Sequence, residues 1–169
     1  MKTLTGLVIG ALALTAVLAA TPALADGQGN KLMTEIEMKV SNKAHAAVIA
    51  ERRMAMRALS GSMKKIAAFM KKNEGTAADV KAAAMKIEEI AKSVHAKFPA
   101  GTGMADYPGF TGAKPAVHSD AAGFKEVSLK MASLAADLAK AVESGASKGD
   151  LGAKSVSYTH LTLPTILRV

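Results

Sequence analysis

Apolar residues recur at steps of three and four in three stretches of the chain, and this periodicity constrains the fold more than any other feature. Such a repeat places one apolar stripe along an α-helix, whereas a half-buried strand would alternate every second residue. The stripes predict helices over residues 31–73, 76–96 and 119–144. Their members are Ala44, Val48, Ala55, Leu59, Met63, Ile66 and Met70 in the first, Val80, Ala84, Ile87, Ala91 and Val94 in the second, and Phe124, Val127, Met131, Leu134, Leu138 and Ala141 in the third.

Capping signals mark the ends of the expected helices. Gly75 follows the first stripe, and the run Thr76-Ala77-Ala78-Asp79 resembles a capping box that opens the second helix. Ser119 is expected to cap the third helix, and Gly145 is expected to end it. Residues 97–118 are rich in Pro and Gly, so we expect this connection to be irregular.

A fourth helix starts after Gly145, because Ser147-Lys148-Gly149-Asp150-Leu151 has the pattern of a helix opening. Three amphipathic helices and the start of a fourth predict an all-α, antiparallel, up-down-up-down four-helix bundle. The chain contains no cysteine, so no disulfide can hold this bundle together. Its stability must come from packing of Ala, Met and Leu side chains.

The first 25 residues have the composition of a secretory signal. Lys2 supplies a positive start, Leu7 to Ala20 forms an apolar segment, and Ala23-Leu24-Ala25 offers small residues for cleavage after Ala25. The alternative is an uncleaved membrane anchor, but a spanning helix needs about 20 apolar residues, and Pro22 interrupts this stretch. We therefore expect a periplasmic protein without a stable membrane anchor, in which residues 26–154 form the bundle domain.

The end of the chain differs in composition from the rest. Residues 155–169 are rich in Thr and Leu, contain Pro164, and continue no helical period. They resemble a translated adapter sequence at the end of an assembled reading frame. We therefore interpret 155–169 as a non-native tail, and we expect the fourth helix to be largely missing or replaced by it.

The formal net charge of +8 is compatible with nucleic acid, anionic lipid or an acidic protein as a partner. Only 4% of the residues are aromatic, so a platform for stacking bases is not expected, and we predict no nucleic-acid partner. The lysines are spread over several helix faces, which favours a solvated surface. They include Lys64, Lys65, Lys71, Lys72, Lys81 and Lys86.

No local motif indicates catalysis. The chain has no Gly-rich phosphate loop, no His-Glu-x-x-His and no nucleophile beside a matched base, so we predict neither catalytic residues nor an enzyme. The four histidines are far apart in sequence, and none forms a ligand pair at helical spacing. They are His45, His95, His118 and His160, and we expect no metal site made by them.

Two segments carry a resemblance to a known family. The first is Val48-Ile49-Ala50-Glu51-Arg52-Arg53-Met54-Ala55-Met56-Arg57-Ala58-Leu59 on the first helix. The second contains Phe98-Pro99-Ala100-Gly101-Thr102, then Thr111-Gly112-Ala113-Lys114-Pro115-Ala116-Val117-His118-Ser119-Asp120, then Gly123-Phe124. In order and separation they resemble cytochrome c′, a class II cytochrome c, and the resemblance covers about residues 44–151.

The resemblance implies a haem c cofactor and two residues beside it. Arg52 matches the family's Arg near the haem, where it would neutralise a propionate or lie at the haem edge, and Met56 matches the apolar residue that covers the sixth iron position. From the residues alone, Arg52 could instead be a surface side chain that extends into water, and Met56 an ordinary core residue. The resemblance also implies a homodimer, an unidentified redox partner and a small diatomic ligand such as NO.

One departure from the family affects function directly. The family carries Cys-x-x-Cys-His on its fourth helix, where two thioethers hold the haem and the His binds iron. This chain has no cysteine, and we interpret it as truncated before that motif, so it cannot attach haem c. The complete form is expected to be a periplasmic haem protein for electron transfer or NO binding. The alternative is a haem-free helical bundle that acts as a binding or structural module.

Overall fold

The computed structural model describes residues 27–154, and the predicted signal and tail lie outside them. The helices follow the order α1 (Gly27–Lys39), α2 (Lys43–Lys72), α3 (Ala77–Ser93), the 3₁₀ turn η1 (Val94–Lys97), α4 (Ala116–Ser119) and α5 (Ala121–Glu143). Residues 148–154 are also helical, and the described residues contain no strand. The predicted all-α fold is confirmed.

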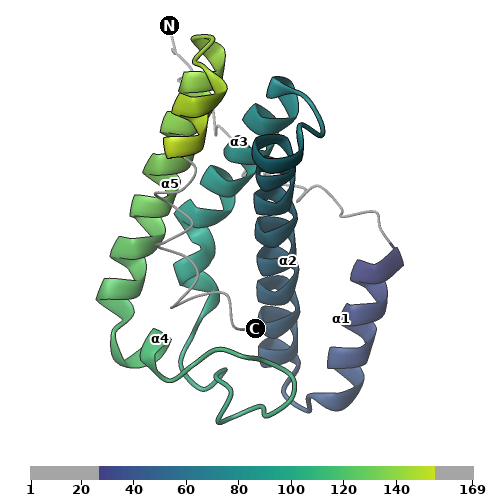
Figure 1. Ribbon diagram of the computed structural model, residues 1–169. Helices are drawn as coiled ribbons and strands as arrows, with labels where there is room; N and C mark the ends of the chain where they lie inside the picture. Colours follow the sequence, from purple (N-terminus) through teal and green to yellow (C-terminus); the bar gives the residue numbers. More distant parts are fainter. Residues whose placement is uncertain (1–26, 155–169) are drawn as a thin grey trace, which may run out of the picture.

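Helices α2, α3 and α5 form the body of the bundle and run in alternating directions, while α1 lies against the outer side of α2 (Figure 1). Helix 148–154 folds back at the end of α5, which gives the predicted up-down-up-down order. Its Leu151 is only 3% exposed and joins the core between α2, α3 and α5. The fully buried members of that core include Leu59, Ile66, Ile87, Met131 and Leu138.

The prediction of one helix over residues 31–73 is wrong, because the helix is interrupted between Lys39 and Lys43. Asn42 adopts an extended backbone (φ −80°, ψ 106°), and its side-chain oxygen accepts a hydrogen bond from the His45 N–H at 3.2 Å. This N-cap satisfies one of the free donors of α2 and starts a new helix. The apolar spacing before Ala44 gave no sign of this interruption. Ile36 and Val40 are buried in the structure, as one continuous helix would also have placed them.

The buried face of α2 also differs from the predicted stripe in its first half. Ala46, Ile49 and Ala50 are buried, whereas Ala44 is exposed and Val48 is half-buried. The reason is α1, because Ile36 of this helix and Val40 just after it pack in one cluster with these α2 residues. From Leu59 onward the predicted stripe faces the main core, and it is confirmed at Leu59 and Ile66.

The ends of α3 and α5 test the predicted caps. Thr76 and Asp79 form the predicted capping box, in which the Thr76 N–H donates to Asp79 Oδ2 at 2.8 Å. Ser119 does not cap α5, because it is the last residue of the short helix α4, and Asp120 Oδ1 accepts from the Gly123 N–H instead. Residues 97–118 were expected to be irregular throughout. The structure corrects this at both ends, because η1 extends to Lys97 and α4 begins at Ala116. Gly145 has φ +70° just beyond α5, as its predicted role requires.

Of the helices within residues 27–154, none combines the length and the apolar character that crossing a bilayer requires.

Candidate functional site

Arg52 lies in the third turn of α2 and is only 2% exposed, so it is not a surface arginine that extends into water. Its Nη2 donates to the Thr102 carbonyl oxygen at 2.7 Å and to Thr111 Oγ1 at 2.6 Å. Its Nη1 donates to Thr102 Oγ1 at 3.1 Å and, more weakly, to the Lys97 carbonyl at 3.5 Å. The guanidinium therefore joins α2 to both ends of the 98–115 loop.

The charge of Arg52 is buried without a carboxylate partner, since no ion pair among residues 27–154 includes it. The Phe98 ring lies under the guanidinium, with its centroid 4.7 Å from Cζ, and adds a cation–π contact. Burial lowers the pKa of Arg52 to about 10, so the side chain remains cationic at neutral pH. Carbonyl and hydroxyl dipoles of the loop are what compensate this charge.

Met56 lies one turn after Arg52 on the same side of α2, because residues four apart share a helix face. It is 4% exposed and belongs to the core cluster that α3 and α5 complete. The structure thus brings Arg52 and Met56 together, with one side chain directed to the loop and the other packed in the core. Their roles beside a haem stay a prediction.

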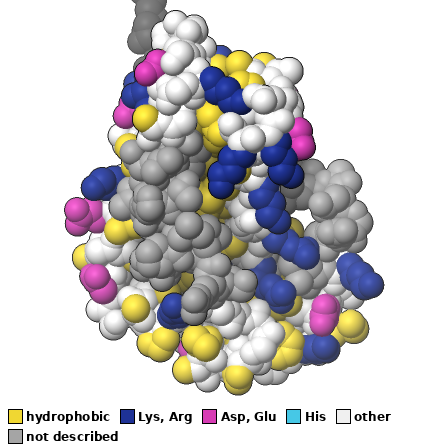
Figure 2. Space-filling view, viewed as in Figure 1, with side chains coloured by type: hydrophobic (Ala, Val, Ile, Leu, Met, Phe, Trp, Pro, Cys, Tyr) yellow, Lys and Arg dark blue, Asp and Glu magenta, His cyan; other side chains and the backbone are white. Residues whose placement is uncertain are grey.

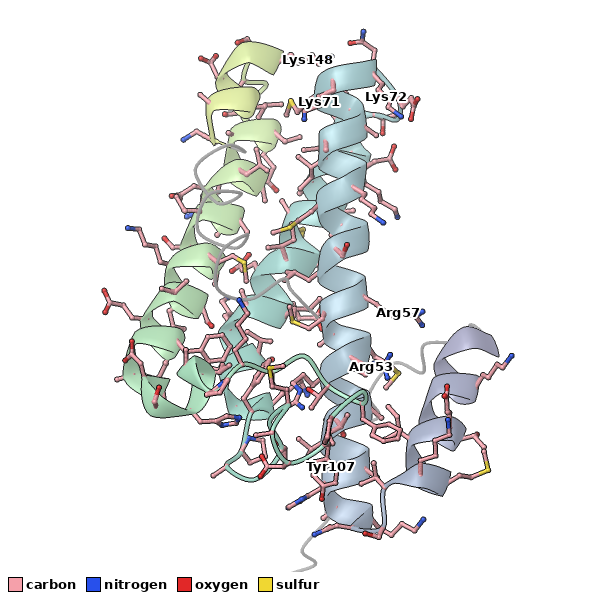
Figure 3. The ribbon with its side chains drawn as sticks, turned by 60° about the horizontal axis from the view of Figure 1, so that its bottom comes forward. Arg53, Arg57, Lys71, Lys72, Tyr107 and Lys148 are labelled. Carbon is pink, nitrogen blue, oxygen red and sulfur yellow. The ribbon has the colours of Figure 1, made fainter. Side chains whose placement is uncertain are left out.

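The loop itself is held by several further contacts around the start of α2 (Figure 3). Tyr107 OH lies 2.8 Å from His45 Nδ1, and the two rings meet edge to face. Within the loop, the Met104 N–H donates to the Ala113 carbonyl at 2.9 Å. Phe98 also packs edge to face on Phe124 of α5, at 5.0 Å between centroids. The loop is therefore a folded cover that contacts both α2 and α5.

Thr102 and Thr111 are the partners of Arg52 that sequence reasoning missed. They lie 50 and 59 residues after it, so no local spacing links them to α2. The segments that contain Thr102 and Thr111 indicated turns and carried part of the family resemblance, but neither signal linked these two residues to Arg52.

The histidines do not gather into a site. His45 is paired with Tyr107, and the buried atoms His95 Nδ1 and His118 Nε2 have no hydrogen-bond partner within 27–154. No group of three or more His, Cys, Asp or Glu side chains in the described part of the chain could hold a metal ion. His160 lies outside that part.

Comparison with known families adds one match. A family model described as Cytochrome C' matches residues 47–158, which include α2, the loop and α5. The chain belongs to the cytochrome c′ family. No curated protein and no solved structure matches it. The match reaches four residues past 154, where the predicted tail begins, in a segment outside the described residues.

The family implies haem c, and this chain does not fit a covalently attached haem. Thioether attachment needs two cysteine thiols, and the chain has none. The described part of the fourth helix, 148–154, contains no histidine to bind iron. The donors of Arg52 already hold Thr102 and Thr111, so the residues present form a closed α2–loop contact.

Proposed function

We propose that this bundle is the scaffold of a periplasmic c-type haem protein that transfers electrons or binds a diatomic gas such as NO. The match of the cytochrome c′ family over residues 47–158 carries this proposal. The activity would belong to a form of the bundle whose fourth helix bears Cys-x-x-Cys-His, because this chain supplies no thiol. We propose binding and electron transfer, not enzymatic turnover.

Two observations support the proposed haem-side residues Arg52 and Met56. Both are buried, and they stand one turn apart on α2, the helix in which the family match begins. Met56 is long, unbranched and polarizable, so it can pack against a flat ring and restrict access to one side of it. Arg52 would keep the covering loop in place through the four hydrogen bonds of Nη1 and Nη2, and its Nε–H would be the donor for an anionic group.

The experiment uses a version of the chain that carries Cys-x-x-Cys-His on a restored fourth helix. NO affinity should rise on Met56→Ala, because a shorter side chain leaves more room on the open side of the haem. Met56→Leu is the matched control, since its volume is nearly the same and its affinity should stay unchanged. If Met56→Ala leaves NO affinity unchanged in a folded, haem-loaded protein, Met56 is not at the site.

A further inference from the structure

Four cations of α2 lie on one face of this helix, and we call them the basic stripe: Arg53, Arg57, Lys64 and Lys71. At about 100° per residue, they fall within about 40° of one another around the helix axis. At 1.5 Å per residue, the stripe is about 27 Å long. Figure 2 shows Lys and Arg side chains running along this face of α2. The lysines are scattered in the sequence, and their alignment with the arginines follows from the course of the helix.

The stripe has no acidic neighbour on its own helix. From Arg52 to Lys72, α2 contains no Asp or Glu, and Glu51 is engaged by Lys97 at 3.1 Å. No ion pair in the described part of the chain includes a member of the stripe. Among the hydrogen bonds within residues 27–154, Arg53 makes one to the loop, since its Nη1 donates to the Phe110 carbonyl at 3.4 Å. Arg57, Lys64 and Lys71 are exposed.

Helix α3 shows the opposite arrangement. Its Lys81, Lys86 and Lys92 each contact a carboxylate, at 2.6, 2.8 and 2.6 Å. Within residues 27–154, the three lysines of α3 are therefore ion-paired, whereas the four members of the basic stripe on α2 are not. Like charges one turn apart, as at Arg53 and Arg57, repel each other and destabilise a helix. An anionic surface placed on the stripe would remove that repulsion.

The surroundings of the stripe favour a protein partner over a lipid surface. Membrane-binding helices combine basic residues with exposed apolar anchors. The large apolar side chains that the structure describes as exposed are Met38, Met85, Met104 and Leu129, and none belongs to α2. Between the cations lie Ser60, Gly61 and Ala67. These residues are small, so a partner backbone can approach closely.

The surroundings also disfavour a single-stranded nucleic acid as the partner. Proteins bind such strands partly by stacking the bases on aromatic side chains. The aromatic residue near the Lys71 end of the stripe is Phe69, which is half-buried. The Lys148 ammonium lies over it, with Nζ 5.3 Å from the ring centroid. Lys148 also donates to Asn73 Oδ1, so this end of the stripe is closed by the start of the fourth helix. Figure 3 shows Lys71, Lys72 and Lys148 together at that end.

We propose that the basic stripe of α2 is a docking surface for an acidic protein, one that presents a row of carboxylates along a helix. Arg53 and Arg57 can each bind a carboxylate through two N–H groups, while Lys64 and Lys71 act as point charges further along. The docking does not depend on haem, so it stands independently of the proposed function.

The probe is a synthetic helical peptide of about 18 residues, long enough to span the stripe, with Glu at the spacing of the four cations. A peptide of the same composition in scrambled order is the comparison. Binding to the purified full chain is measured by fluorescence anisotropy at low salt and at about 0.15 M salt. The ordered peptide should bind more tightly than the scrambled one, and its affinity should fall as salt rises.

The stripe variant is Arg57→Glu/Lys64→Glu, and its matched control is Lys125→Glu/Lys130→Glu on exposed positions of α5, which changes the net charge equally. The stripe variant should lose about tenfold or more in affinity, and the control less than about threefold. Circular dichroism checks folding, and Arg57→Gln/Lys64→Gln replaces the stripe variant if charge reversal unfolds the helix.

Three results would overturn this proposal. Equal losses in the stripe and control variants would mean that net charge alone attracts the peptide. Equal binding of ordered and scrambled peptides would show that the row of carboxylates is not recognised. Stripe-dependent binding to mixed phosphatidylglycerol–phosphatidylcholine vesicles that exceeds binding to the peptide would assign the surface to a membrane.

Discussion

At the scale of single residues, Arg52 connects α2 to a loop about 50 residues further along the chain. A buried cation is costly unless its N–H groups are hydrogen-bonded. Here the acceptors are the hydroxyls of Thr102 and Thr111 and the Thr102 carbonyl. The resemblance to a family drew attention to Arg52 and Met56, and both are buried. The loop partners could not be predicted, because the contact closes over 50 residues and depends on the folded loop.

Replacing Arg52 should destabilise the fold markedly. Arg52→Ala removes the hydrogen bonds to the Thr102 carbonyl and to the hydroxyls of Thr102 and Thr111 and opens a void, so unfolding free energy should fall by about 2–4 kcal/mol. Urea unfolding measures this loss. Arg57→Ala, one exposed turn away, is the control and should change stability by less than about 0.5 kcal/mol. Equal stability of Arg52→Ala and the parent chain would mean that the loop is not held by this side chain.

Asp79 should contribute to stability at neutral pH and lose this contribution in acid. Its pKa is lowered from 3.8 by hydrogen bonds from the Thr76 hydroxyl and the Thr76 N–H. The folded state therefore favours the carboxylate, which stabilises the protein above pH 3.8 and stops doing so as pH falls through the lowered pKa.

In Asp79→Asn this acid-sensitive contribution is absent. Unfolding free energy measured by urea at pH 7 and pH 3 should therefore differ less in the variant than in the parent chain. An identical difference in both proteins would show that Asp79 titrates as it does in the unfolded chain.

At the scale of elements, periodicity predicted the long helices well and their junctions poorly. The capping box of α3 and the stop at Gly145 follow from local chemistry, so both could be read from the sequence. The break before α2 could not, because the apolar spacing of Ile36 and Val40 continues across it. The Asn42 side chain caps the new helix with one hydrogen bond. Such a cap contributes about 1 kcal/mol to stability, and an apolar stripe does not reveal it.

The docking of α1 on α2 is tested by two substitutions on the same helix. Ile36 is fully buried against Ile49 and its neighbours, so Ile36→Ala should lower unfolding free energy by about 2–4 kcal/mol. Met38 is 74% exposed, and Met38→Ala should change it by less than about 0.5 kcal/mol. Thermal or urea unfolding gives both values. Similar small effects in the two variants would mean that α1 is not packed on α2 in solution.

At the scale of the whole molecule, the chain combines a family's bundle with the absence of its attachment chemistry. The fold depends on many dispersed apolar positions, so it could be predicted from the pattern. The haem site depends on three residues of one motif, and a chain without cysteine cannot form it. The family match and the lack of thiols are therefore compatible.

The most direct test of this account is the amount of covalent haem on two chains. One is the chain as it stands, and the other carries Cys-x-x-Cys-His on a restored fourth helix. Both are produced in cells that mature c-type cytochromes, then denatured and extracted with solvent before the absorbance is measured. The account predicts no haem on the first chain and retained haem on the second. Retained haem on the first chain, or none on the second while another c-type cytochrome matures in the same cells, would contradict it.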